Sequence, residues 1–574
     1  MKLPSNQPEN QSLLMTLLSG ITTSSGTQRT DLLEKQHWHQ LNNPVLNALA
    51  DTASEKSSDP DKETDSTIES VTLPGIVYLP LQYRGKSLMS AVTEGQTVVR
   101  GEPVAYPAIN AIDNTALPGL VSPVHGVVCD CNFKLTVTAN RSPESFIAIK
   151  TDIDHPLDQY SHTNRFTSDW TESDHEQRLK LLVDYGITGH GGGGFLLANK
   201  LRRDIYTLII NAVECEPLIS CDNALLQNEP KEILLGILAL VEMTGCEQCL
   251  VATEAVPLGS ASPADALMRA FDELKSTSSD NNIKLSLERV SFRVVNRQYP
   301  AGAERILIKT LTGKVISGNT TPSDNSISCV NVATCHALYP IACHVRAPVN
   351  RIVTVCGDAL AEKTGIISRN FKVRLGTPVR HLLESAGVIE RRGSSAEKTL
   401  RVLQGGPLCG TELESLDTPV TQQTNCIVAT FSPAVSEPDA CIRCTNCQEV
   451  CPVNLMPQEL HRFISATNLD EAADIHLEDC LLCGYCDLVC PSHIPLTEQF
   501  RSARQNLREQ AESRQLATQA EQRFAERQLR LSKKAEEKEK RQAQQRESAT
   551  DASVRKQAID AALNRVRARK QNSD

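Results

Sequence analysis

The pattern of apolar and polar positions divides the chain into segments of different character. From 71 to about 150, short β-branched runs are broken by Gly and Pro, which predicts a β-rich module. From about 174 to 345, strand-like apolar runs alternate with helical segments, which is typical of an α/β domain with a partly parallel sheet. Residues 350–425 have the pattern of a small α+β unit.

Several elements of these segments can be placed from the sequence alone. Ser173 or Asp174 suits the N-cap of an amphipathic helix that ends near Gly186. The other elements that we expect are a strand at Thr207–Ile210, a helix at Lys231–Met243, a strand at Ile352–Val355 and a helix that opens at Val379–Glu384.

The two ends of the chain differ from its middle. Residues 1–70 are rich in Ser, Thr, Asn, Asp and Glu without periodicity, which predicts a mostly disordered extension with a short helix around Leu32–Leu49. Within it, His37-Trp38-His39 is either a metal or partner site or an exposed trio without function. After Pro495 the chain contains neither Gly nor Pro and is dense in charged residues, Gln and Ala, which predicts a long exposed helix.

Length and charge exclude some classes of protein. The 574 residues require several domains. The longest apolar run, Ile233–Met243, is too short to span a membrane, and the first residues do not resemble a secretory signal, so we expect a cytoplasmic protein. The net charge of −10 argues against a general nucleic-acid binder. From Arg501 to Asp574 there are 19 Lys/Arg and 11 Asp/Glu, which suits either contact with anionic lipid or an acidic partner, or a merely solvated helix.

Two fragments of the β-rich segment resemble the flattened barrel of lipoyl and biotinyl carrier domains. They are Glu94–Val104 and Ser122–Val128. Carrier domains present a lysine on the hairpin between such fragments, but no lysine occurs between Gly101 and Ser122. We therefore predict a structural barrel-sandwich module without a swinging arm.

The clearest chemical signal is a duplicated cysteine motif near the end of the folded part. Cys441–Pro452 and Cys480–Pro491 both read C-x2-C-x2-C-x3-C-P. Three close thiolates hold one [4Fe-4S] cluster, and the fourth cysteine of each run reaches the neighbouring cluster. The predicted ligand sets are Cys441, Cys444, Cys447 and Cys490 for one cluster, and Cys480, Cys483, Cys486 and Cys451 for the other. Structural zinc, the alternative, favours pairs of C-x2-C with a wider gap.

A glycine-rich loop in the α/β segment is a candidate phosphate or flavin site. The loop follows the first predicted helix and runs directly into an apolar segment, which argues against a flexible linker. Its backbone N–H groups can approach a flat or anionic ligand closely. The candidate residues are Gly189, Gly191, Gly192, Gly193, Gly194, Phe195 and Lys200.

Polar residues follow the strands of the same segment. In the run Asn211–Pro217, Asn211 can bind a flavin edge, while Glu214 and Glu216 can accept hydrogen bonds from ribose hydroxyls. A purely structural turn is the alternative for this run. Further along, Asn331 and Thr334 offer short polar groups to a phosphate.

Taken in order, these motifs resemble one family. The glycine loop, the turn NAVECEP, NVAT, the tracts RLGTPVRHLLESAG and LQGGPLCGTELESLDTPVTQQTNCIVA, and the two cysteine motifs are similar to the C subunit of the Rnf/Rsx ion-translocating electron transport complex, from about Leu73 to Phe500. That family resembles the flavin- and NADH-binding subunit of respiratory complex I. The resemblance implies that the loop with Lys200, Asn211 and the NVAT turn holds FMN, and that Glu214 and Glu216 line an NADH site.

The resemblance also implies a domain order and a cellular place. The predicted fold class is multidomain α/β and α+β. Its parts are a disordered extension (1–70), a lipoyl-like barrel-sandwich (71–150), a Rossmann-like FMN/NADH domain (170–345), an SLBB β-grasp module (346–428), a two-[4Fe-4S] ferredoxin-type domain (432–498) and a charged helical tail (499–574). We expect a peripheral subunit on the cytoplasmic face of the bacterial inner membrane, whose partners are other subunits of the complex and NADH or ferredoxin.

Departures from the family pattern leave alternatives open. Where the family loop usually continues Ala-Gly-Phe-Pro-Thr, this chain has Gly193, and Leu196-Leu197 replaces Pro-Thr; Leu218 stands where a Tyr is common, and the GGIHPP-like start is missing. The preferred function is electron transfer from NADH through FMN and two clusters to membrane partners, or the reverse. The alternatives are a cluster-bearing docking subunit with a degenerate flavin site and a free-standing NADH dehydrogenase.

Other reactive side chains have simpler interpretations. His190 in the glycine loop is either a catalytic acid or a solvent-facing loop residue. The twelve cysteines outside the two motifs, including Cys215 and Cys221, are expected to be small buried side chains.

Overall fold

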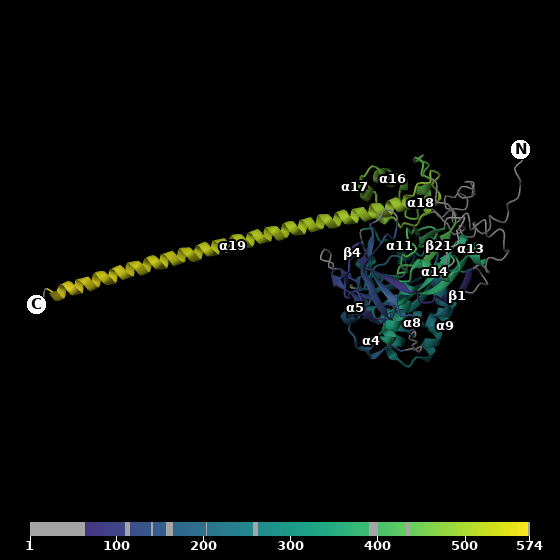
Figure 1. Cartoon of the computed structure of the whole chain (residues 1–574), viewed down its shortest axis with the longest axis horizontal. Coiled ribbons are helices and arrows are strands. Elements are labelled where there is room, and N and C mark those ends of the chain that lie inside the picture. The colour runs from purple at the N-terminus through teal and green to yellow at the C-terminus, as the bar shows by residue number, and fades with distance from the viewer. Residues whose placement is uncertain are drawn as a thin grey trace. The chain divides into compact units, whose positions relative to one another are not determined.

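The computed structural model describes most of the chain beyond residue 63 (Figure 1). The described ranges are 64–109, 115–138, 142–155, 163, 165–201, 204–256, 262–318, 320–389, 400–431 and 437–571. The helix expected around 32–49 and the trio His37-Trp38-His39 lie outside them. The chain forms two compact units, Met1–Arg504 and Gln505–Asp574, which are described separately.

The β-rich module contains two small antiparallel sheets around one apolar core. The first has the order β2-β12-β11-β6 and the second β10-β7-β5. Their bounds are β2 Ile76–Pro80, β5 Met89–Ser90, β6 Thr97–Val98, β7 Pro103–Tyr106, β10 Leu120–Val121, β11 Gly126–Leu135 and β12 Glu144–Thr151. Two hairpins, β3 (Gln82–Tyr83) with β4 (Lys86–Ser87) and β8 (Ala108–Ile109) with β9 (Ala116–Leu117), complete the module. Both sheets contribute to the shared core, for example Val104 and Ile147.

The α/β domain is built on a four-stranded parallel sheet of order β15-β14-β13-β16. The strands are β13 Thr207–Ala212, β14 Gln248–Glu254, β15 Val290–Val295 and β16 Ile327–Asn331. The helices are α4 Ser168–Glu172, α5 His175–Asp184, α6 Leu197–Lys200, α7 Cys221–Asn228, α8 Pro230–Thr244, α9 Asp265–Thr277, α10 Asn281–Glu288, α11 Glu304–Thr312 and α12 Val332–His344, with a 3-10 turn η3 at Pro322–Asn325. The predicted partly parallel sheet is thus confirmed, as is the cap of α5, where Asp174 forms a capping box with Gln177.

Helices α8 and α12 pack tightly against each other in the α/β domain. Most residues of both helices are buried, which explains the long apolar run in α8. They approach closely at Gly236, where a Cβ atom would lie 1.8 Å from the carbonyl oxygen of Cys335. Only glycine fits there, so this contact fixes α12, which begins directly after Asn331 at the end of β16.

A further sheet, which we call the six-stranded sheet, has the order β1-β18-β17-β21-β19-β20. Its bounds are β1 Thr64–Ser70, β17 Asn350–Cys356, β18 Ser368–Arg374, β19 Arg401–Gln404, β20 Thr411–Glu412 and β21 Cys426–Thr430, with helices α13 Asp358–Thr364 and α14 Val379–Ser385. The boundary predicted at residue 70 is wrong, because β1 pairs with β18. Arg369 in β18 binds the carboxylate of Glu69 through Nε (2.8 Å) and Nη2 (2.6 Å), a long-range contact that composition does not reveal.

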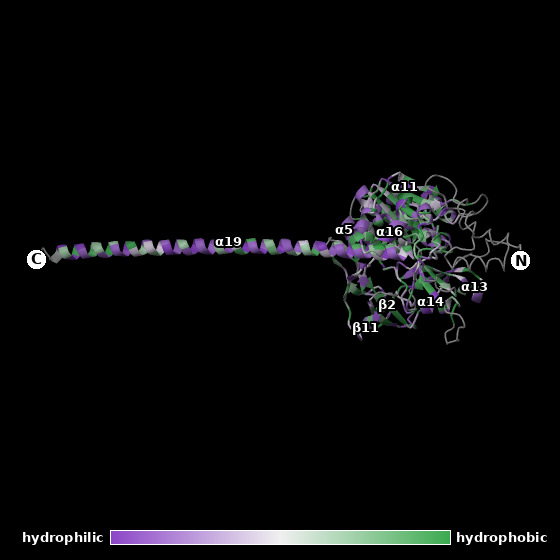
Figure 2. Cartoon of the chain, turned by 90° about the horizontal axis from the view of Figure 1, so that it is seen from above, coloured by the Kyte–Doolittle hydropathy of each residue, from purple (hydrophilic) through white to green (hydrophobic). Residues whose placement is uncertain are grey.

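The cysteine-rich region consists of short helices joined by the cysteine loops. They are α15 Asn446–Glu449, α16 Pro457–Ser465, α17 Leu469–Asp474 and α18 Tyr485–Leu488, with a 3-10 turn η4 at Leu477–Asp479. Helix α19 follows and runs from Leu496 to Gln571, as the absence of Gly and Pro predicted. Figure 2 shows that α19 is mostly hydrophilic, with apolar residues scattered along it. Among the described residues, no helix combines the length and hydropathy that crossing a bilayer requires.

Candidate cluster and flavin sites

The eight motif cysteines line two separate hollows. The first hollow is lined by Cys441, Cys444, Cys447 and Cys490. The second is lined by Cys451, Cys480, Cys483 and Cys486. Each hollow therefore contains three cysteines of one motif and the last cysteine of the other, which are the ligand sets proposed from the spacing. Four thiols around one apolar-walled hollow are the donor set that a [4Fe-4S] cluster needs.

The two hollows differ in exposure. Cys441 and Cys444 are exposed, and Ile442 between them is 68% exposed. Cys480, Cys483 and Cys486 are all partly buried. We call the hollow at Cys441 the outer cluster site and the hollow at Cys480 the inner cluster site.

The inner cluster site is attached to the α/β domain by direct hydrogen bonds. The hydroxyl of Tyr299, which follows β15, donates to the carbonyl oxygen of Cys483 at 2.8 Å. In return the hydroxyl of Tyr485 donates to the carbonyl oxygen of Tyr299 at 3.0 Å, and the two rings meet edge to face at 5.3 Å. Arg305 of α11 donates to the carbonyl oxygen of Glu478 at 3.1 Å. Within the described ranges, the four cysteines of the outer site form no hydrogen bond with the α/β domain.

A second connection runs through the loop 405–410 of the six-stranded sheet. The carboxylate of Glu216 accepts from the backbone N–H of Leu408 (3.1 Å) and of Cys409 (3.2 Å). The same loop touches the inner cluster site, because a Cβ at Gly484 would lie 2.0 Å from the carbonyl oxygen of Leu408. Arg501 also donates to the carbonyl oxygen of Cys409, at 3.0 Å. Glu216 therefore connects the turn after β13 to the loop beside the inner cysteines.

The glycine-rich loop lies at the junction of β16 and α12. It closes on itself through the N–H of Gly189, which donates to the carbonyl oxygen of Phe195 at 2.8 Å. The N–H of His190 donates to the hydroxyl of Thr334 at 2.9 Å, and a Cβ at Gly191 would lie 3.3 Å from the Asn331 side chain. Gly192 and Gly194 have φ values of 85° and 60°, which favour glycine. The structure thus brings the loop together with Asn331 and Thr334.

Positive charge gathers around Phe195 at the end of this loop. The guanidinium of Arg84, in the β3–β4 hairpin, lies 3.9 Å from the centre of the Phe195 ring, and its Nη1 is 3.4 Å from the carbonyl oxygen of Gly193. The Nζ of Lys200 lies 5.9 Å from the same ring and pairs with Glu304 at 2.8 Å. The sequence analysis names Lys200 as a candidate at this loop but not Arg84, which comes from a different module.

The side chains of Leu196 and Leu197, where the family usually has Pro-Thr, lie in the apolar core of the α/β domain. They have no donor to offer to a phosphate. Any anion at this loop would therefore be held by backbone N–H groups and by the two cations near Phe195.

Asn211 faces the protein, since its Nδ2 donates to the carbonyl oxygen of Gly302 at 2.8 Å and its Oδ1 accepts from the N–H of Val213 at 3.1 Å.

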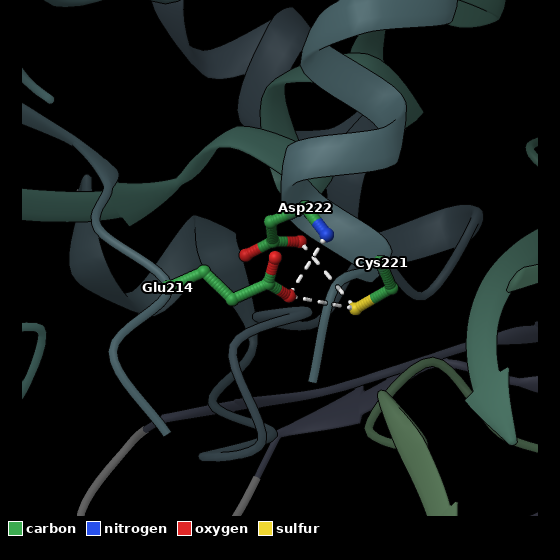
Figure 3. Close-up of side chains that lie close together, drawn as sticks. All are labelled: Glu214, Cys221 and Asp222. Carbon is green, nitrogen blue, oxygen red and sulfur yellow. Dashed lines mark hydrogen bonds between the residues drawn. The ribbon is translucent and has the colours of Figure 1, made fainter. Parts of the chain in front are cut away.

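Glu214 forms a compact buried group with Cys221 and Asp222 (Figure 3). Its carboxylate accepts from the N–H of Asp222 (3.0 Å) and of Asn223 (2.9 Å) at the start of α7. The thiol of Cys221 approaches the same carboxylate at 3.4 Å. Because protein donors already bind the carboxylates of both Glu214 and Glu216, a role of either residue in binding ribose stays a prediction.

His190 corrects one interpretation of the loop. The sequence suggests either a catalytic acid or a solvent-facing residue, but His190 is buried. Burial and the nearby Arg351 guanidinium lower the pKa of His190 well below its usual value, so the ring is neutral. Arg351 donates to the carbonyl oxygen of His190 at 2.5 Å. The residue therefore packs and orients the loop, and a neutral imidazole is poorly suited to donate a proton as an imidazolium.

Comparison with known proteins agrees with this geometry. The Nuo51 FMN-binding domain matches residues 182–340, and the 4Fe-4S dicluster domain matches residues 434–494. The C subunit of the "Ion-translocating oxidoreductase complex" of Klebsiella pneumoniae is 32% identical over 519 residues, which cover 88% of this chain and 64% of the relative. The protein of the same name from Yersinia enterocolitica is 31% identical over 510 residues, covering 88% of this chain and 68% of the relative. The chain belongs to this family.

Within this family of C subunits, the chain spans somewhat less than two thirds of the length of some relatives; the share is 64% for the Klebsiella protein and 62% for the Cronobacter sakazakii protein. The two matching domains confirm that FMN and two [4Fe-4S] clusters are the cofactors of this family member. One chain of an NAD+-reducing [NiFe]-hydrogenase is also similar, with a TM-score of 0.37 and 18% identity over 57% of this chain and 63% of its own. A likeness that distant says nothing about the sites.

The buried carboxylate of Glu214 should make the stability of this chain depend on pH. Burial, and the negative charge of Asp222 beside it, raise the pKa of Glu214 to about 8 from a normal value of 4.5. Between these values the folded state binds more protons than the unfolded state, so stability falls as pH rises, by roughly 2–4 kcal/mol. In Glu214→Gln the fall in melting temperature between pH 6 and pH 8 should be smaller than in the unchanged chain. Glu288→Gln, which changes an exposed side chain, should behave like the unchanged chain. If the melting temperature fell equally with pH in all three proteins, the role of Glu214 would be contradicted.

Proposed function

We propose that the chain is the peripheral electron-input subunit of a membrane-bound ion-translocating oxidoreductase, and that it acts on the cytoplasmic face of the membrane. In this proposal electrons pass between NADH and the α/β domain, and then through the two clusters to membrane-embedded partners. The relatives' shared name supports membership of such a complex, and the FMN-binding and dicluster domains support the order of the cofactors along the chain. Bound FMN would supply the conversion of a hydride into single electrons.

The observation that carries the proposal is the asymmetric placement of the two cysteine hollows. The inner site is bonded to the α/β domain through Tyr299, whose hydroxyl donates to the Cys483 carbonyl oxygen. The outer site has its cysteines Cys441 and Cys444 exposed. An electron that leaves the α/β domain therefore meets the inner site first, and a docked partner meets the outer site first. Two sites placed this way suit a relay, with one end in the domain and the other at the surface.

On the flavin side, the chain's own residues would position and shield the ligand. The backbone N–H groups of Gly191 to Gly194, with the charges of Arg84 and Lys200 beside them, suit an anionic group. Asn331 caps α12 by accepting from the N–H of Ala333 at 2.8 Å, which aims the N-terminus of that helix toward the loop. We propose that these residues, together with Phe195 and Thr334, form the FMN site, and that the eight motif cysteines hold the clusters.

The second candidate function is a cluster-bearing docking subunit with a degenerate flavin site. The observation that favours it is that Leu197 stands where the family usually has a hydroxyl, and that the side chains of both Leu196 and Leu197 are buried in the apolar core. The two functions differ in flavin content. Acid extraction of anaerobically purified chain should release close to one flavin and eight iron atoms per chain if the first is right. Eight iron atoms with only traces of flavin would support the docking subunit instead.

A further inference from the structure

The segment 552–569 of helix α19 differs in charge from the helix before it. Residues 505–551 carry eleven Lys/Arg and nine Asp/Glu, which nearly balance. Residues 552–569 carry five basic residues and one acidic residue: Arg555, Lys556, Arg565, Arg567 and Arg569 against Asp560. The basic excess of the long helix is therefore concentrated in this one segment.

The same segment carries an exposed apolar stripe. Ile559, Leu563 and Val566 are 60%, 50% and 58% exposed. Their i, i+4, i+7 spacing places them on one face of the helix. Apolar residues near the C-terminal end of α19 can be seen between hydrophilic ones in Figure 2. An exposed stripe of large side chains is costly in water, so it indicates a surface to be covered.

Basic residues border this stripe on both sides. With 100° per residue, Lys556 and Arg567 project beside one edge of the stripe, and Arg555 and Arg569 beside the other. Val554 and Ala561 project from the opposite face of the helix. An apolar stripe between two rows of long cationic side chains matches an anionic bilayer surface, where the apolar groups enter the interface and the cations reach the headgroups.

We propose that residues 552–569 of α19 bind in the plane of an anionic membrane surface. This inference goes beyond the proposed electron transfer and does not depend on it. A second copy of the helix fits the segment less well, because both flanks are basic and would repel in a paired helix. A coiled coil also needs apolar residues repeated along one face of the helix. On the face that contains Ile559 and Val566, the positions between Leu531 and Ile559 include Lys538, Gln542 and Gln545, so the apolar repeat is interrupted.

The test compares two double variants of the full-length chain that introduce the same charge. Ile559→Asp/Leu563→Asp removes the stripe, whereas Val554→Asp/Ala561→Asp places two aspartates on the opposite face. Binding is measured by co-sedimentation with vesicles of phosphatidylcholine alone and of phosphatidylcholine with phosphatidylglycerol, at low and high salt. Circular dichroism and iron content check that both variants keep the helix and the clusters.

We expect the unchanged chain to bind the anionic vesicles and to lose most of this binding at high salt. The stripe variant should bind at least about tenfold more weakly than the opposite-face variant. Three results would overturn the proposal: no binding to anionic vesicles, equal loss in both variants, or equal binding to vesicles without phosphatidylglycerol. A change in oligomeric state that only the stripe variant abolishes would assign the stripe to a second copy and would also overturn it.

Discussion

A Cys483→Ala variant is expected to hold about half of the iron of the unchanged chain and to lose fast reduction of its remaining cluster by NADH. The variant removes one of the four thiols that line the inner hollow. The remaining cluster then sits in the outer hollow, away from the hydrogen bond that ties Cys483 to Tyr299 in the α/β domain. Because the proposed relay then lacks its first member, the electron must cross a longer gap, and NADH-driven reduction of the remaining cluster should be much slower than in the unchanged chain.

The matched control removes a thiol from the other hollow. Cys444→Ala should also lose about half of the iron, since Cys444 lines the outer hollow. In this variant NADH should still reduce the remaining cluster rapidly, while transfer to an external acceptor slows. Dithionite should reduce the surviving cluster in both variants, which shows that each cluster is intact. If NADH reduced the Cys483→Ala protein faster than the Cys444→Ala protein, the proposed order of the clusters would be wrong.

The two sets of cysteines can be predicted from the sequence, because most members of each set are close together in the chain. Each motif places three thiols within seven residues, so a single loop brings Cys480, Cys483 and Cys486 together. The exchange of the last cysteine between the two runs follows from the duplication. The hollow that contains Cys451 with the second motif agrees with that reasoning. Local patterns also supply α5 with its Asp174 cap, because the cap and the helix are adjacent in the chain.

What sequence cannot supply are contacts between distant segments. Tyr299 and Cys483 are 184 positions apart, and no local pattern marks them as partners. Arg84 contacts the ring of Phe195 but belongs to another module. Strand β1 pairs with β18, which lies about three hundred positions later in the chain. For the same reason, the sequence alone predicts that Glu214 and Glu216, in the turn after β13, accept hydrogen bonds from a ligand. Only the fold reveals that α7 and the loop at Leu408 supply donors to them.

Lys200→Ala is expected to lower the flavin content of the purified chain by about tenfold under dilute conditions. Lys200 is one of the two cations near Phe195, and its Nζ also donates to the carbonyl oxygen of Cys329 at 3.1 Å in β16, the strand that leads to Asn331. A charge-assisted hydrogen bond of this kind contributes about 1.5–3 kcal/mol. Its loss would weaken both the attraction of an anionic ligand and the position of the strand end. The measurement is flavin fluorescence after acid extraction, relative to iron.

The same domain offers a matched control. Lys231 forms an ion pair with Glu273 at 2.9 Å, but both side chains are more than half exposed. Exposed pairs contribute about 0–1 kcal/mol, so Lys231→Ala should leave flavin and iron unchanged. Loss of flavin in both variants would indicate a general loss of stability of the α/β domain. Full flavin in Lys200→Ala would exclude Lys200 from the site and leave the backbone of the glycine loop, together with Arg84, as the groups that hold the ligand.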